Sequence, residues 1–378
     1  MNHCSTHVLR FRKNLDRKPW RSAVSLHSHT MHSREYLGRL PEYISRIPIA
    51  SHLIEREVGR IHLYRHVVVD FRRVYWTPPL SAREAYRLEA GQIEQNLGLS
   101  PLVSLSDHDN VEAGLHLSML QETSHVPVSV EWSAPYEGTV FHLGVHNLPA
   151  SDANSWMEHF RRFTAKPGRK RLRSLLQELN SDPSVLLILN HPFWSAEGVA
   201  ASVHRESLAA FLKEFSPLLH ALELNGLRSK KENRAVLALG KETGLPVISG
   251  GDRHGCEPNA VLNLTSARTF SEFVQEIRVD RRSEVLLMPQ FFDTLQLRLL
   301  ESAWHALSDA PGEFGRRHWI SRVFVEMNDG ESRPLSQLTG PRFHQFVDRF
   351  RFIMAFLASP QIRPALRLAF FATEESGL

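Results

Sequence analysis

An apolar run, a polar cluster and then a helical stretch follow one another repeatedly over the first two thirds of this 378-residue chain. Apolar runs at 101–105, 184–189 and 246–249 have the length of buried strands, and 231–243 has helical periodicity. Alternating strands and helices favour a parallel sheet, and the active sites of α/β barrels lie at the carboxyl ends of the strands. The pattern therefore predicts an α/β barrel in which clusters far apart in sequence converge.

The first cluster is a His-x-His pair, His27 and His29, directly after a short apolar run. If residues 23–26 form a strand, alternation places both imidazoles on one face, where they can reach a single cation. Taken alone, the pair is also typical of two surface histidines after a strand. Further His, Asp and Glu clusters after later apolar runs, in a chain with 21 histidines, favour the metal site.

The candidate metal ligands share one feature, a place in or shortly after a polar cluster that ends an apolar run. They are His27, His29, Glu35, His108, Glu131, His142, His191, Asp252 and His254. Each has a plain alternative, such as a carboxylate facing solvent or a histidine in a turn. A nitrogen and oxygen set without thiolates suits Zn, Mn or Fe.

Composition restricts the class of protein. The chain is 42% hydrophobic and 23% charged, as soluble globular proteins are. Its two cysteines, far apart, provide no disulfide framework, so a cytoplasmic location is the default expectation. No apolar run has the length of a membrane span, and no membrane partner is expected. The net charge of +4 suits anionic substrates or nucleic acid, and the oligomeric state is left open.

Three regions flank or interrupt the regular pattern. Residues 1–22 are polar and basic and are interpreted as a loose arm. Residues 37–80 have mixed character and are interpreted as an insertion. Residues 263–378 are predicted to be mostly helical, and the apolar stripe of 341–357 is predicted to pack against the parent domain.

The clusters resemble the motifs of the polymerase and histidinol phosphatase (PHP) superfamily. The matching segments are His27-Ser28-His29, Asp107-His108-Asp109, Glu131 with His142, His191-Pro192 and Asp252-Arg253-His254. The resemblance covers about residues 23–262. It implies a distorted, TIM-like (β/α)7 barrel, which holds two or three divalent metal ions and hydrolyses phosphate esters, followed here by the predicted helical C-terminal extension.

The resemblance also implies how the ligands are shared. One ion is held by His27, His29, Glu131 and Asp252, and a second shares Glu131 with His142 and His191. A third lies among His108, His254 and a residue after the first motif, where the family often has Asp. Here the alignment places Arg34 at that position, and Glu35 is taken because it keeps the carboxylate.

The implied chemistry is attack on a phosphate ester by a water that the metal ions activate. Asp107 or His254 could carry protons, although both could instead orient ligands. Phosphate oxygens outside the metal cluster need cationic partners, for which Arg34, Arg228 and Arg253 are the candidates. A plain surface charge is the alternative for each arginine.

Three functions follow, and the first is a phosphatase acting on a small phosphorylated metabolite or nucleotide. The second is an exonuclease or phosphodiesterase acting on nucleic acid, which the basic arm and the basic segment 169–173 favour. Against it, no interleaved aromatic residues form a platform for stacking bases. The third is a non-catalytic, metal-binding regulatory module, which is disfavoured because nearly every ligand position is filled.

Overall fold

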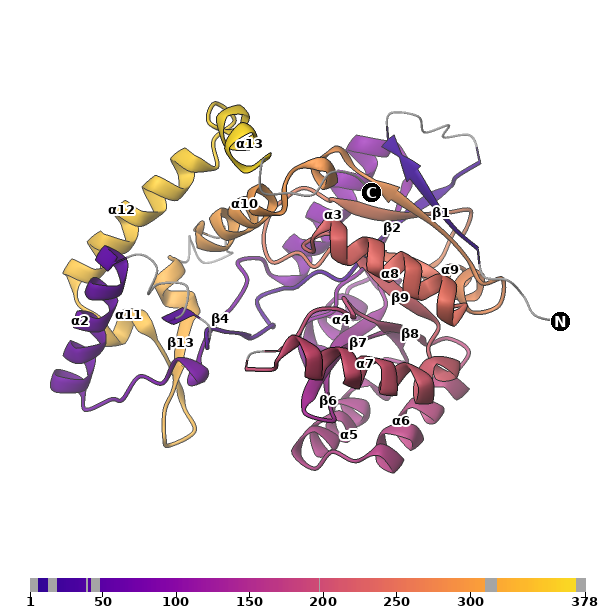
Figure 1. Ribbon diagram of the computed structural model, residues 1–378, viewed down its shortest axis with the longest axis horizontal. Coiled ribbons are helices and arrows are strands. Elements are labelled where there is room, and N and C mark those ends of the chain that lie inside the picture. Colours follow the sequence, from indigo (N-terminus) through magenta and orange to yellow (C-terminus); the bar gives the residue numbers. More distant parts are fainter. Residues whose placement is uncertain are drawn as a thin grey trace.

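The computed structural model describes residues 6–12, 19–38, 40–41, 48–196, 198–309 and 318–371. It consists of a large α/β body and a smaller lobe beside it (Figure 1). Two five-stranded sheets form the body. The first has the order β1 (Thr6–Phe11), β12 (Arg282–Leu287), β11 (Val261–Thr265), β2 (Ser22–Leu26) and β5 (Ser100–Ser104). The second has the order β10 (Val247–Gly250), β9 (Ala221–Asn225), β8 (Leu186–Leu189), β7 (Thr139–Leu148) and β6 (Val128–Tyr136).

The two sheets approach each other just beyond the carboxyl ends of β2, β5 and β10, and within β6. One isolated parallel bridge joins Ser28 to Arg253, and another joins His108 to Glu131. The mixed α/β class expected from the sequence is confirmed. A closed barrel is not confirmed, because no continuous ladder of hydrogen bonds joins the two sheets in the part of the chain that the structure describes.

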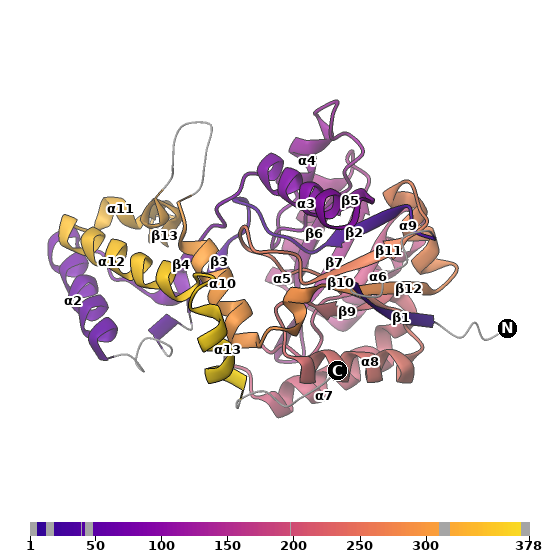
Figure 2. The ribbon, with the colours of Figure 1, turned by 90° about the horizontal axis from the view of Figure 1, so that it is seen from above.

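Helices cover the strands on opposite sides. Figure 2 shows α3 (Ala82–Leu97) on one side and α7 (Ala201–Phe215) and α8 (Lys230–Thr243) on the other. Both α3 and α8 begin with a capping box and end at a left-handed glycine, Gly98 and Gly244, as their sequences indicate. The remaining helices of the body are α4 (Glu112–Ser118), α5 (Ala153–Ala165), α6 (Arg169–Ser181) and α9 (Phe270–Arg278).

The basic N-terminal segment is not wholly a loose arm. Thr6–Phe11 forms β1, which pairs in parallel with β12 at the edge of the first sheet. That prediction is therefore wrong for residues 6–11, because a strand-compatible run finds an open sheet edge far along the chain. Residues 1–5 and 13–18 lie outside the described residues. Since β12 lies beyond residue 262, the sheet also extends past the predicted boundary.

The smaller lobe combines two distant parts of the chain. Its four-stranded sheet has the order β14 (Ser332–Pro334), β13 (Val323–Glu326), β4 (Val74–Trp76) and β3 (Glu35–Tyr36). The helices of this region are α2 (Pro48–Arg65), α10 (Leu295–Leu307), α11 (Leu335–Leu338), α12 (Pro341–Leu357) and α13 (Arg363–Phe371). Ile61, Val74 and Val323 are buried together in one core cluster. The insertion and the C-terminal region thus fold together.

The apolar stripe of α12 does not pack as predicted. Phe350, Ile353 and Phe356 are exposed, whereas Val347 and Met354 are the buried residues of this helix. A different face of α12 therefore turns inward.

Among the described residues, no helix combines the length and the apolar character needed to cross a membrane.

A buried histidine outside the polar clusters gives the fold a pH dependence. His220 Nδ1 accepts a hydrogen bond from the Leu187 amide at 2.8 Å, and its Nε2 lies 2.7 Å from Asn180 Oδ1. Burial, together with the charges of Arg278 and Arg281, lowers the pKa of His220 to about 3. The ring is therefore neutral in the folded state at neutral pH.

We expect His220 to make unfolding easier as the pH falls from 6.5 towards 3. In the unfolded chain the pKa returns to about 6.5, so only the unfolded state takes up this proton. Urea unfolding at pH 7 and pH 5 will show a loss about 2 kcal/mol larger for wild type than for His220→Asn, which keeps an acceptor for Leu187. Equal losses in the two proteins would contradict the prediction.

Candidate metal centre

The predicted ligands converge in one cluster, and most of them follow the carboxyl end of a strand of the body. They come from the segments after β2, β5, β8 and β10, from β6 and β7 themselves, and from β3 of the smaller lobe. Four overlapping groups each have one ligand atom per residue, with all atoms of a group within 4.8 Å. The groups are His29, Glu35, His108 and His254; His27, His29 and Asp252; His27, Glu131 and His191; and His108, Glu131 and His142.

Glu131 lies at the centre of the cluster and is completely buried. Its Oε2 is 2.9 Å from His27 Nε2 and 3.2 Å from His108 Nδ1. Its Oε1 is 3.2 Å from His142 Nδ1 and 3.0 Å from His191 Nε2. One carboxylate therefore contacts four imidazoles, as a bridging ligand between metal ions would.

Several of the candidate ligand atoms are buried and have no hydrogen-bond partner among the described residues. Although these atoms lie close to one another, His27 Nε2, His29 Nε2, Glu131 Oε2 and His142 Nδ1 are buried and none of them makes a hydrogen bond within the part of the chain that is described. Buried polar atoms without partners are costly, and they are rare in native proteins. Imidazole nitrogen and carboxylate oxygen converging in this way suit a divalent cation. The donor set therefore fits the metal ions that the sequence predicts.

Glu223 belongs to the site, and sequence reasoning missed it as a functional residue. Its Oε1 lies 2.5 Å from His27 Nδ1, and its Oε2 accepts a hydrogen bond from the His191 amide at 2.8 Å. A carboxylate on Nδ1 fixes the imidazole with its Nε2 facing the cluster. The signal in the sequence was a single acidic residue within the buried strand β9.

Burial and charge act against each other on the pKa of these groups. Burial lowers the pKa of His27, but the charges of Glu131, Glu223 and Asp252 outweigh it and raise the pKa. Burial also lowers the pKa of His29, to about 3, and here the nearby His254 adds to the effect. Neighbouring imidazoles can therefore differ in charge within one cluster.

The carboxylate at the third predicted metal site is that of Glu35, from β3 of the smaller lobe. Its Oε2 is 3.4 Å from His254 Nε2 and 3.6 Å from His108 Nε2. Burial lowers the pKa of His254, but Glu35 outweighs it and raises the pKa to about 9. The structure therefore brings Glu35, rather than Arg34, next to the cluster, and the smaller lobe supplies part of the site.

Asp107 lies behind the cluster. Thr30 donates to both of its carboxylate oxygens, from its amide at 2.5 Å and from its hydroxyl at 2.7 Å. Burial raises the pKa of Asp107 to about 7 despite these hydrogen bonds. In this position Asp107 holds the segment that follows His29, and it is completely buried.

The three candidate arginines have different surroundings. Arg34 is exposed, lies 3.5 Å from Glu326, and places its guanidinium 5.0 Å from the centre of the Tyr75 ring. Arg228 Nη2 lies 3.3 Å from Asp252 Oδ2. The prediction that Arg253 contacts phosphate is wrong, because this residue is 3% exposed and pairs with a buried carboxylate of α3.

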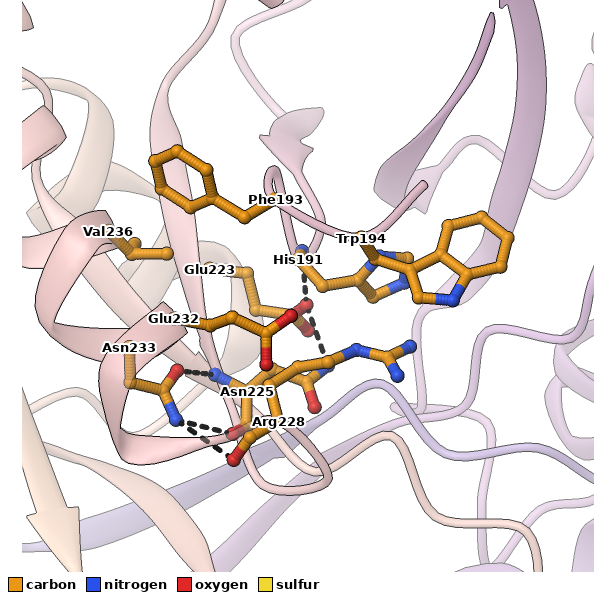
Figure 3. Close-up of a pocket in the computed structure, with 9 residues that line it drawn as sticks. All are labelled: His191, Phe193, Trp194, Glu223, Asn225, Arg228, Glu232, Asn233 and Val236. Atoms are coloured by element: carbon orange, nitrogen blue, oxygen red, sulfur yellow. Dashed lines mark hydrogen bonds between the residues drawn. The ribbon is translucent and has the colours of Figure 1, made fainter. Parts of the chain in front are cut away.

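Two hollows adjoin the cluster. The larger has a volume of about 910 Å³ and is bounded by Glu35, His108 and His142 on the cluster side. Asn154 and Met157 of α5 form part of its far wall. The smaller is a crevice of about 10 Å³ beside His191 and Arg228, which has room for about one water (Figure 3). Only the larger can hold an organic substrate.

Several ligands have an unusual backbone conformation. His27, His191 and Asp252 have φ values of 62°, 26° and 54°, in the left-handed region that non-glycine residues rarely adopt. Asp109, beside His108, has a φ of 49°. Such conformations persist only where surrounding contacts hold them, and they gather at functional sites. The ends of these strands are therefore held by their contacts in the conformation that directs the ligands inward.

Comparison with known proteins gives weak structural similarity. No protein-family model and no curated protein sequence matches the chain. An amidohydrolase from Chromobacterium violaceum is 13% identical, with a TM-score of 0.34 over 47% of this chain and 84% of that one. A protein assigned as a metal-dependent phosphoesterase from Bifidobacterium adolescentis is 14% identical, with a TM-score of 0.33 over 54% and 92%. PsfC from Pseudomonas syringae is 13% identical, with a TM-score of 0.34 over 71% and 93%. Scores this low assign neither fold nor activity to this chain.

Proposed function

We propose that this chain is a metal-dependent hydrolase of the PHP type that cleaves the phosphomonoester of a small metabolite or nucleotide. The observation that carries the proposal is the convergence of four imidazoles on the buried Glu131 beside a cavity of about 910 Å³. The proposal includes a distorted (β/α)7 barrel. Its support is the pair of isolated bridges, which link the segment after β2 to the segment after β10 and the segment after β5 to β6.

The proposed ions are two or three of Zn, Mn or Fe, held by overlapping ligand sets. One site would use His27, His29, Glu131 and Asp252. A second would use Glu131 with His142 and His191, and a third Glu35, His108 and His254. Divalent ions in these positions neutralise phosphate oxygens and activate a water for attack.

The chain's own residues would bind the phosphate and carry the proton. Arg34 lies beside Glu326 and Arg228 beside Asp252, and both side chains are partly exposed. Their charge can hold phosphate oxygens that point away from the cluster. His254 donates from Nδ1 to the Asp252 carbonyl at 3.0 Å, and its Nε2 lies 3.4 Å from Glu35 Oε2. With only two ions bound, this nitrogen would hold the proton that the leaving group needs, and with a third ion bound it would be a ligand instead.

The surroundings favour a small substrate over nucleic acid. The basic segment that suggested nucleic acid is engaged within the protein: Arg169 pairs with Glu137, and Arg173 lies 2.9 Å from Glu214. Arg171 donates to main-chain carbonyls. The cavity exceeds what a phosphate group needs and has the size of sites that hold small organic ligands.

The proposal is tested by metal analysis and phosphatase assay of the purified protein. We expect two or three equivalents of Zn, Mn or Fe by mass spectrometry, and turnover of an aryl phosphate that His191→Ala abolishes. His52→Ala, at an exposed position of α2, serves as the matched control and retains activity. Bound metal without hydrolysis of any phosphomonoester would overturn the proposal in favour of a regulatory module. Preferred cleavage of oligonucleotides would replace it with a nuclease, and no metal even after reconstitution would refute it.

A further inference from the structure

We propose that Arg253 and Glu89 act as positioning residues, forming a buried ion pair that sets the geometry of the metal ligands on both sides of it. Arg253 lies between Asp252 and His254 in the sequence, and Glu89 lies on α3, away from the ligand cluster. The inference rests on the proposed metal binding. It concerns two residues that no comparison assigns and that have no contact with the cavity among the described residues.

The pair is tightly enclosed. Arg253 is 3% exposed and Glu89 is 2% exposed. Arg253 Nη1 lies 2.9 Å from Glu89 Oε1 and donates to Asn259 Oδ1 at 2.6 Å. Gln92, one turn further along α3, also accepts from this nitrogen, at 3.4 Å. Helix α3 therefore holds the side chain of Arg253 from two positions.

The same carboxylate holds the His-x-His segment. Ser28 Oγ donates to Glu89 Oε1 at 2.6 Å, and Ser25 Oγ donates to Glu89 Oε2 at 2.7 Å. Ser28 is the residue between His27 and His29. Glu89 thus contacts the middle residue of both ligand-bearing segments, His27–His29 and Asp252–His254.

The backbone of the two segments is joined at the same place. The His29 amide donates to the Arg253 carbonyl at 2.8 Å, and the Arg253 amide donates to the His27 carbonyl at 3.3 Å. Ser28 and Arg253 point towards α3, as their contacts with Glu89 show, while the ligands on either side of each contact the cluster. Rotation of either middle residue would therefore move two ligands at once.

A role in positioning metal ligands accounts for the buried pair of Arg253 and Glu89, whereas a contribution to stability alone does not. Burying two charges carries a desolvation penalty that often exceeds their attraction, and apolar residues of similar volume are often as stable. Partners that orient metal ligands from behind, in contrast, are worth about 10- to 100-fold in metal affinity. Asp252, with its φ of 54°, needs such a restraint.

Metal affinity, measured by competition with a chelator, separates positioning from stability. The variants are Arg253→Lys, Arg253→Met, Glu89→Gln and the double variant Glu89→Met/Arg253→Met, which leaves no unpaired buried charge. The control is Arg363→Met, which breaks another partly buried pair, with Asp293 at 2.6 Å in the smaller lobe. All titrations are made at a temperature where circular dichroism shows the metal-free protein to be folded.

We expect Arg253→Met and the double variant to bind metal about 10- to 100-fold more weakly than wild type. Arg253→Lys will lose less affinity, since it keeps the charge without the guanidinium fork. Arg363→Met will lose stability alone. Wild-type affinity in every folded variant, whatever its melting temperature, would overturn the inference. Failure of the wild type to bind metal would instead refute the proposed function, so the two failures are distinguishable.

Discussion

Replacing Glu131 by Gln is expected to lower kcat/KM for an aryl phosphate by at least about 100-fold and to reduce the bound metal. Removing even an outer partner of a metal ligand costs up to about 100-fold, and Glu131 contacts four imidazoles directly. Gln has the same shape and keeps an oxygen for Asn190, which donates to Glu131 Oε1 at 3.0 Å. The lost charge, rather than a cavity, would therefore cause the effect.

Steady-state kinetics and metal analysis of the same preparation check this result. Glu137→Gln, at the tip of the hairpin formed by β6 and β7, is the matched control, because Glu137 pairs with Arg169 away from the cluster. The control will keep wild-type metal content and activity. If Glu131→Gln keeps its full metal content and its activity, Glu131 is not the bridging ligand.

The second large effect is expected from Gly250→Ala in β10. A Cβ at this position would lie 1.5 Å from Glu223 Oε1 and 2.4 Å from Glu223 Cδ. Glu223 must then move and abandon its 2.5 Å contact with His27 Nδ1, or β10 must separate from β9. Overpacking costs about 1–3 kcal/mol of unfolding free energy, and loss of the carboxylate on His27 weakens metal binding about 10- to 100-fold.

Urea unfolding of the metal-free protein and chelator competition measure the two parts of this effect. Gly59→Ala is the control, because Gly59 lies within α2 and a Cβ there would meet nothing within 4 Å. That substitution is expected to stabilise the helix by about 0.5–1 kcal/mol. Unchanged stability together with unchanged metal affinity in Gly250→Ala would show that Glu223 is free to move without consequence.

The site could be predicted from the sequence where chemistry restricts residue type. Divalent ions without thiolates need His, Asp or Glu, and strand ends are where an α/β fold gathers them. These grounds predict His27, Glu131 and Asp252 as ligands, and the structure brings them within reach of one another. The carboxylate of Glu35 favours it over Arg34 as a ligand, and Glu35 lies beside His254 and His108.

Other features depended on contacts that no local pattern encodes. Arg253 resembled a phosphate ligand because it stands between two site residues, but its partner is on α3. The segment 6–11 looked like a solvated arm because its sheet edge is provided by β12. The apolar stripe of α12 indicated a buried face, but packing against the rest of its lobe selected another.

By itself, the sequence determined the α/β alternation, the capped helices and the candidate ligands, because each depends on local backbone preference or on the chemistry of a side chain. Only the tertiary structure decided how the ligands are held. Glu223 meets His27 across 196 positions, and Glu89 meets Ser25 across 64. A buried carboxylate supports a metal ligand only where the packed chain brings the two together in a fixed geometry, and that geometry arises from long-range contacts.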